Sequence, residues 1–148
     1  MKREVSYKEV ESMLYNLSSL RASVVDIQIE IENVRNDYGL SGASDNDIKP
    51  TTPTNHTTSV DDALIKKDNS IEQLARLKRN KKLQVERIEN MLTILREDEI
   101  QLVEFRYFKK YSLYRIAGLL DLSYETVKGN RRLIISSLAT FLNSKQNQ

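Results

Sequence analysis

The stretch SLYRIAGLLDLSYETVKGNRRLIISSL, residues 112–138, contains two apolar runs at helical spacing, separated by a short break at residues 121–123. The apolar residues of the first run recur every three or four positions, as in a helix with one buried face. They are Leu113, Ile116, Ala117 and Leu120. Those of the second run are Val127, Leu133, Ile134 and Leu138. Two short helices joined by a tight turn are therefore predicted, which is the layout of a helix-turn-helix motif.

The three residues of the break suit such a turn. Asp121 stands where glycine is usual, but aspartate tolerates the left-handed backbone conformation better than most residues do. Leu122 is expected to fill the turn with its side chain. The Ser123 hydroxyl is expected to accept hydrogen bonds from the first amides of the second helix. We therefore expect the turn to form without a glycine.

The predicted second helix has basic residues on the face that its apolar side chains leave free. Lys128, Arg131 and Arg132 lie there. A helix fits the major groove of DNA, where base edges present a distinguishable pattern of donors and acceptors. Short helical hairpins that never touch DNA have a similar apolar pattern. Any one of these cations, taken alone, fits a solvated surface charge as well as it fits a contact to DNA. The motif by itself leaves both interpretations open.

The residues upstream of the motif add a further helix. An amphipathic helix is predicted over residues 100–108, after the acidic turn 97–99 and before the polar break 109–112. With these segments, residues 95–138, LREDEIQLVEFRYFKKYSLYRIAGLLDLSYETVKGNRRLIISSL, resemble the promoter-reading C-terminal domain of bacterial sigma factors, called region 4. The resemblance covers about a third of the chain.

The resemblance implies roles for individual residues. By motif position, the residues expected to reach the bases are Tyr124, Glu125, Thr126, Lys128 and Gly129. Chemically, Glu125 can accept a hydrogen bond from cytosine and Lys128 can donate one to guanine. Phosphate contacts, which fix position rather than sequence, are expected from Lys109, Lys110, Arg115, Arg131 and Arg132. Because Gly129 has no side chain to offer, either the backbone approaches the DNA closely there or specificity is modest.

The N-terminal part of the chain carries an apolar seam with alternating spacings of three and four. Its members are Val10, Met13, Leu17, Leu20, Val24, Ile27, Ile31, Val34 and Tyr38. This spacing is typical of the a and d positions of a coiled coil, over about four heptads. We predict a long helix over residues 1–38 that needs a partner to cover its seam.

Residues 39–60 hold two of the four glycines and both prolines, so they are interpreted as a flexible linker. A second long helix is predicted over residues 61–95, beginning at Asp61 or Asp62, with the basic run 78–82 interrupting its apolar stripe and exposed. Its apolar positions are Leu64, Ile71, Leu74, Leu77, Val85, Ile88, Met91, Leu92 and Leu95. The predicted fold is all-α, with a helix-turn-helix domain over residues 96–148.

The partner of the N-terminal seam remains open at this stage. The second long helix can fold back as an antiparallel hairpin and bury both seams within one chain. Alternatively, the seam pairs with a second chain. We expect a homodimer, because one helix with a polar interruption covers the seam incompletely.

Composition excludes several classes of protein. The chain has one histidine, no cysteine and no phosphate-binding glycine loop, so we expect neither catalysis, nor a cofactor, nor a metal site. No apolar run is long enough to span a membrane, and the N-terminus lacks the apolar core of a signal peptide, which predicts a cytoplasmic protein. Residues 105–145 contain eight basic and two acidic side chains, which favours a polyanionic partner.

The whole arrangement resembles the phage late-gene transcription regulators of the RinA and ArpU type. The resemblance implies binding to double-stranded DNA near a promoter and activation of late genes, with RNA polymerase as a candidate further partner. Two alternatives remain open. One is a small terminase subunit, which also joins a helix-turn-helix to an oligomerising helical part. The other is a region 4 mimic that docks on RNA polymerase or another regulator without reading DNA.

Overall fold

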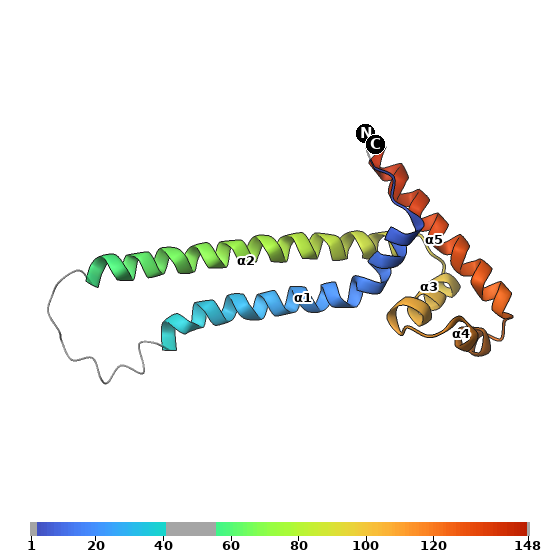
Figure 1. Cartoon of the computed structure of the whole chain (residues 1–148), viewed down its shortest axis with the longest axis horizontal. Helices are drawn as coiled ribbons and strands as arrows, with labels where there is room; N and C mark the ends of the chain where they lie inside the picture. The colour runs from blue at the N-terminus through green and yellow to red at the C-terminus, as the bar shows by residue number, and fades with distance from the viewer. Residues whose placement is uncertain (1–2, 41–55, 148) are drawn as a thin grey trace. The chain divides into compact units, whose positions relative to one another are not determined.

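The computed structural model describes the backbone of residues 3–40 and 56–147, and the side chains of residues 3–37 and 61–147. Every regular element in these ranges is helical, as predicted. The elements are α1 (Tyr7–Leu40), α2 (His56–Leu92), α3 (Glu97–Val103), the π-helical turn η1 (Glu104–Phe108), α4 (Leu113–Leu120) and α5 (Tyr124–Gln146) (Figure 1). Within the described residues, no helix is both long and apolar enough to cross a membrane.

The chain folds into two compact units, and the division between them falls inside α1 and α2. The terminal unit consists of the residues up to Leu20 together with those from Gln84 onward, and the central unit is Arg21–Leu83. This division differs from the predicted one, which gave the first helix and the region from residue 96 to separate domains. The first turns of α1 and the last turns of α2 instead belong to the same unit as α3, α4 and α5.

In the central unit, α1 and α2 form the predicted pair of long helices (Figure 1). The Lys67 ammonium donates a hydrogen bond to the Arg35 carbonyl oxygen over 3.1 Å, and the Lys78 ammonium donates one to the Gln28 side-chain oxygen over 2.6 Å. From Lys67 to Lys78 the residue numbers rise along α2, while their partners on α1 fall from Arg35 to Gln28. The two helices are therefore antiparallel.

The predicted seam of α1 faces inward along both units. Val10, Leu17, Ile27 and Ile31 are buried, and Met13, Leu20, Val24 and Val34 are half-buried. The side chain of Tyr38 lies outside the described residues. Leu14, which the sequence pattern left out of the seam, is fully buried as well. In the terminal unit α1 meets several elements rather than one helix, so its buried face is wider than an a/d seam.

Helix α2 differs from the prediction at both ends and in its middle. It begins at His56, ahead of the predicted start at Asp61 or Asp62, and it ends at Leu92, before the predicted end at Leu95. Leu77 is exposed, while Lys78 and Lys81 of the basic run are half-buried, so the prediction of a buried Leu77 and a wholly exposed basic run is wrong. The reason is register, because Lys78 and Lys81 continue the inward spacing of the helix and extend their apolar stems along it. Residues 41–55 of the predicted linker, and the His56 side chain, lie outside the described residues.

The core of the terminal unit is built from all its helices. Its buried apolar side chains are Val10, Leu14, Leu17, Val85, Ile88, Met91, Leu95, Leu102, Val103, Tyr107, Leu113, Ile116, Ala117, Val127, Ile134, Ile135 and Leu138. Ser6 and Glu9 close the start of α1 with reciprocal hydrogen bonds, the Ser6 amide to the Glu9 carboxylate and the Glu9 amide to the Ser6 hydroxyl, over 3.0 and 3.2 Å. This capping box fixes the first turn of α1 where it enters the core.

Helix α5 is longer than predicted, and one of the four side chains predicted to be buried on it is exposed. It runs to Gln146 rather than ending near Leu138. The predicted burial of Leu133 is wrong, since this side chain is 69% exposed. Val127, Ile134, Ile135 and Leu138 define the buried face, and Leu133 lies about 100° around the helix from Ile134.

Candidate nucleic-acid interface

Helix α4 begins and ends with local hydrogen bonds that set the following turn. The Ser112 hydroxyl accepts a hydrogen bond from the Arg115 amide over 3.2 Å at the start of the helix. At its end, Asp121 adopts the left-handed conformation (φ 55°, ψ 44°), and the Leu122 amide donates to the Ala117 carbonyl over 3.0 Å. The prediction that Asp121 can replace the usual glycine is therefore confirmed at the level of the backbone.

Helix α5 begins directly after this turn. The Ser123 hydroxyl accepts a hydrogen bond from the Thr126 amide over 3.1 Å, as predicted, and lies 2.7 Å from the Thr126 hydroxyl. Leu122 is 42% exposed and does not fill the turn, so that part of the prediction is wrong. The left-handed residue and the backbone hydrogen bond hold the turn without an apolar plug.

The two helices around the turn pack through the predicted apolar faces. Leu113, Ile116 and Ala117 of α4 are buried, with Leu120 half-buried, and Val127, Ile134 and Leu138 of α5 are buried. Because these side chains occupy one face of α5, the first turns of that helix present their other face to solvent. The position of this outward face decides which of the predicted contact residues are accessible.

The residues expected to reach bases divide into two groups. Glu125, Thr126 and Gly129 are exposed, whereas Tyr124 and Lys128 are half-buried. A methyl group added at Gly129 would meet nothing within 4 Å, so packing does not require glycine there. The helix therefore presents a bare stretch of backbone between the side chains on this face.

Tyr124 is held by an aromatic partner on α4. Its ring stacks on that of Tyr114 with centroids 4.3 Å apart and planes at 18°. Tyr114 is 73% exposed, so the pair forms a flat aromatic surface beside the first turn of α5. Sequence reasoning did not identify Tyr114 as part of this surface.

The residues expected to contact phosphates also divide. Lys109, Lys110, Arg115 and Arg132 are exposed. Arg131 is half-buried, and its Nε is shielded from solvent with no hydrogen-bond partner among the described residues. Arg131 is thus turned partly toward the core, apart from the other four cations, and is a poorer candidate for a phosphate contact than the sequence suggested.

Four residues of η1, α4 and the segment that joins them form a cluster of alternating rings and cations. This aromatic–basic cluster consists of Phe105, Lys109, Tyr111 and Arg115. The Arg115 guanidinium lies 3.8 Å from the centroid of the Tyr111 ring, and the Lys109 ammonium lies 5.3 Å from that of Phe105. Cations held over aromatic faces keep their charge at the surface while losing conformational freedom.

The backbone around this cluster is fixed by non-helical hydrogen bonds. The Lys109 amide donates to the Glu104 carbonyl over 2.8 Å, closing the π-helical turn, and the Tyr111 amide donates to the Phe105 carbonyl over 2.9 Å. The Arg106 guanidinium donates to the Tyr111 carbonyl over 3.1 Å. Lys110 adopts a left-handed conformation at φ 60°, which turns the chain sharply toward α4.

Behind this surface, Tyr107 links η1 to α1. Its hydroxyl donates a 2.8 Å hydrogen bond to the Glu11 carboxylate, and its ring contacts that of Tyr15 edge to face at 4.8 Å. Burial, followed by this hydrogen bond to the carboxylate, raises the pKa of Tyr107 well above its ordinary value. A neutral phenol donor is therefore kept at the contact between the first turns of α1 and the segment before α4.

Sequence reasoning missed these supporting contacts for different reasons. Rings and cations alternate over residues 105–115, and this local signal was available for the aromatic–basic cluster. Glu11 and Tyr107 are far apart in the chain, and nothing in either local sequence connects them. Within the described residues, no group of three or more His, Asp and Glu side chains lies close enough to hold a metal ion.

Comparison with known proteins identifies a family for the chain. The family model described as Protein of unknown function (DUF722) matches residues 24–140, and the chain belongs to this family. No curated protein and no solved structure is significantly similar to it.

Proposed function

We propose that this member of the DUF722 family is a sequence-specific DNA-binding transcription regulator. The observation that carries the proposal is the outward face at the start of α5. Glu125, Thr126 and Gly129 are exposed there, on a helix whose other face is fixed in the core. A helix supported on one side and free on the other can enter the major groove without disturbing the fold.

Base contacts are assigned to the first turns of α5. Glu125 accepts from the amino group of cytosine, and Lys128, with its stem half-buried, reaches guanine with its ammonium group. At Gly129 the helix backbone can approach a base pair closely, because no side chain projects from it. The stacked ring of Tyr124 supports the edge of this face.

Phosphate contacts are assigned to cations on either side of that face. Arg132 follows it on α5, and Lys109, Lys110 and Arg115 precede it around the start of α4. The aromatic–basic cluster holds Lys109 and Arg115 in place before any DNA arrives, which lowers the entropy lost on binding. Arg131 is left out of this set, because its Nε is shielded from solvent.

On the resemblance to phage late-gene regulators, we also propose that the protein acts near a promoter as an activator and binds as a homodimer. The central unit exposes Val25 and Ile29, which lie one turn apart on α1 and are 60% and 51% exposed. A second copy of the chain can cover these two side chains. Light scattering of the intact protein in solution measures its mass, and a monomer at all concentrations would remove the homodimer from the proposal.

The DNA proposal is tested by selecting duplexes from a random pool and measuring binding to the winning sequence and to a shuffled one. Lys128→Ala is expected to lower the preference between the two duplexes. Arg132→Ala is expected to weaken binding to both and to reduce the salt dependence by about one phosphate contact. Arg79→Ala, in the central unit, is the matched control. Base readout by α5 is refuted if no sequence is enriched. It is also refuted if Lys128→Ala and Arg132→Ala each lower the affinity for the selected and the shuffled duplex by the same factor.

A second candidate function is favoured by exposed apolar residues on α4 and in the turn. Tyr114, Leu119 and Leu122 are all more than 40% exposed, which suits a protein partner such as RNA polymerase. In that case the chain docks on its partner without reading DNA. Leu119→Ser would then abolish activity in a transcription assay, while Lys128→Ala would leave it unchanged.

A further inference from the structure

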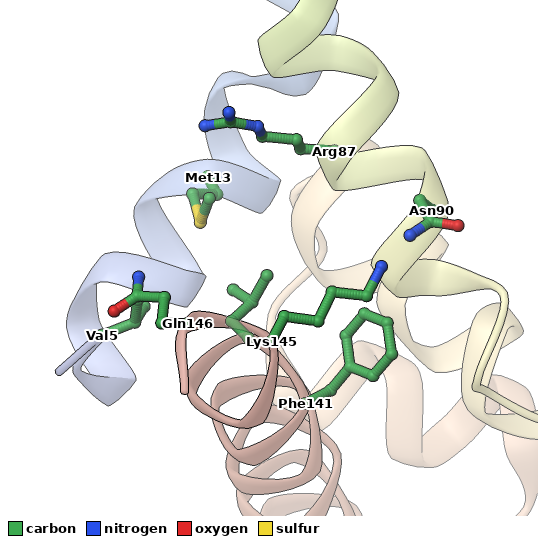
Figure 2. Close-up of a pocket in the computed structure, with 8 residues that line it drawn as sticks. Val5, Met13, Arg87, Asn90, Phe141, Lys145 and Gln146 are labelled. Carbon is green, nitrogen blue, oxygen red and sulfur yellow. The ribbon is translucent and has the colours of Figure 1, made fainter. Parts of the chain in front are cut away.

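A groove of about 410 Å³ lies in the terminal unit, between the first turns of α1, the last turns of α2 and the end of α5 (Figure 2). Its apolar lining includes Val5, Met13 and Phe141. Sites for small molecules typically have volumes of about 300–1,000 Å³ and combine an apolar lining with a few polar groups. The groove has the size and the lining of such a site.

The polar groups of the groove are basic. Arg87 on α2 and Lys145 on α5 both line it, and none of the described lining residues is acidic. Among the described residues, no carboxylate lies within salt-bridge distance of either cation. The Lys145 ammonium lies 4.7 Å from the centroid of the Phe141 ring and points toward α2, while Arg87 points toward α1 above Met13 (Figure 2).

The walls of the groove are fixed by neighbouring contacts. The Asn143 side chain binds the Val5 backbone twice, accepting from its amide over 2.7 Å and donating to its carbonyl over 3.2 Å. Met13 precedes Leu14 and Asn90 precedes Met91, and both of these neighbours are fully buried. A groove whose walls are already ordered loses little freedom when a ligand binds.

We propose that this groove binds a small organic acid, with its apolar body against Met13 and Phe141 and its carboxylate attracted by the positive charge that Arg87 and Lys145 supply on two walls of the groove. Charge selects the carboxylate, because the groove offers two cations that have no carboxylate partner in the described part of the chain. The apolar lining selects a ligand with a hydrocarbon or aromatic body over an inorganic anion. The groove lies at the far end of α5 from Glu125, about 30 Å along the helix at 1.5 Å per residue, so its ligand leaves the proposed DNA-binding face free.

The experiment follows the methionine methyl groups of the intact protein by NMR, with octanoate as the probe. The chain has three methionines, Met1, Met13 and Met91. Met13 lines the groove, whereas Met91 is fully buried in the core. Octanoate at millimolar concentration is expected to shift the Met13 signal in a saturable way and to leave that of Met91 in place. The absence of a saturable Met13 shift would overturn the proposal.

Two further probes test whether binding needs both the negative charge and the apolar body of the acid. Octan-1-ol has a similar apolar body without the charge, and inorganic phosphate has the charge without the body. Each is expected to shift Met13 much less than octanoate does. An equal response to octan-1-ol would mark a plain apolar surface, and an equal response to phosphate would mark unspecific attraction of anions. Either outcome would overturn the proposal.

Substitutions assign the carboxylate to its cations. Lys145→Gln and Arg87→Gln are each expected to weaken octanoate binding about threefold to tenfold, as for loss of one charge-assisted contact. Arg79→Gln changes an exposed cation on the same helix as Arg87 and is expected to have no effect. Equal affinity in all three variants would contradict the assignment. Circular dichroism checks that each variant is folded.

Discussion

The terminal and central units use the same two long helices in different ways. In the terminal unit, α1 contributes three fully buried side chains, Val10, Leu14 and Leu17, to a core shared with five other elements. In the central unit, Ile27 and Ile31 are the buried apolar side chains among the described residues, and lysine hydrogen bonds join the helices. One continuous helix can therefore be a core element at one end and half of a two-helix pair at the other.

This difference decides where a functional surface can be built. A side chain is held in place only where its helix is supported, and α5 is supported by the core of the terminal unit. The start of α1 is part of that support, through the hydrogen bond between Glu11 and Tyr107. The proposed DNA-binding face therefore depends on residues more than a hundred positions away in the chain.

The largest expected effect comes from separating the terminal unit from the start of α1. A fragment of residues 96–148 is expected to lack a cooperative thermal transition, because it loses the buried side chains that α1 and α2 supply. Circular dichroism melting measures this. As the control, residues 21–83 are replaced by a short flexible loop, which keeps the whole terminal unit and is expected to melt cooperatively. A fragment that melts as sharply as this control would contradict the division into units.

A single core substitution sharpens the same comparison. Leu14→Ala is expected to lower the free energy of unfolding by about 2–5 kcal/mol, because it leaves a cavity in the terminal unit. Glu30→Ala, at an exposed position of the same helix in the central unit and outside the proposed dimer surface, is expected to change it by less than about 0.5 kcal/mol. Urea denaturation of both variants measures the difference. Similar losses in the two would show that α1 is equally buried along its length.

Removing the Tyr107 hydroxyl tests the contact between η1 and α1. Tyr107→Phe is expected to lower the free energy of unfolding by about 1–2 kcal/mol near neutral pH, since the Glu11 carboxylate loses its donor. In the unfolded chain tyrosine ionises near pH 10, whereas the raised pKa keeps Tyr107 neutral in the fold. The stability contributed by the hydroxyl is thus full below pH 10 and declines above it.

The difference in the free energy of unfolding between the wild type and Tyr107→Phe should therefore narrow as the pH rises from 10 to 11.5. Urea denaturation across this range measures it. Other tyrosines titrate in both proteins and cancel in the difference. A gap that stays constant over the range would contradict the burial of the phenol.

The smallest effect on stability is expected at Gly129. Gly129→Ala is expected to raise the free energy of unfolding by up to about 1 kcal/mol, because alanine favours a helix and the added methyl group meets open space. If the backbone there approaches DNA, the same change weakens binding to the selected duplex. Asn130→Ala is the neighbouring control on the same exposed turn. Unchanged DNA binding by Gly129→Ala would remove Gly129 from the proposed interface.

The sequence predicted the helices well because their signals are local. Apolar spacing identified the long pair and the two helices around Asp121, and Ser123 was identified as a helix cap from its position alone. Local patterns could not decide the burial of every apolar side chain, so Leu122 in the turn and Leu133 on α5 were placed inside although both are exposed. Helical periodicity also could not show that α1 changes partner along its length, because Leu17 and Ile27 have the same spacing in either environment.

The candidate site was predictable in part for the same reason. The exposure of Glu125, Thr126 and Arg132 follows from helix geometry once the buried face is known. The shielding of the Arg131 Nε atom arises from packing in the terminal unit, which no local pattern contains. Three-dimensional contacts between distant segments also create the groove beside Met13 and Lys145, which the sequence did not suggest.

The most direct test of the central claim is an amide NMR titration of the intact protein with the duplex selected from the random pool. We predict that the largest changes fall on residues 124–132 at the start of α5, with smaller ones at Lys109, Lys110 and Arg115. A shuffled duplex is expected to shift the cations but to affect Glu125 and Gly129 much less. If neither duplex perturbs the start of α5, or if the changes fall on Leu119 and Leu122 alone, the DNA-reading account is contradicted.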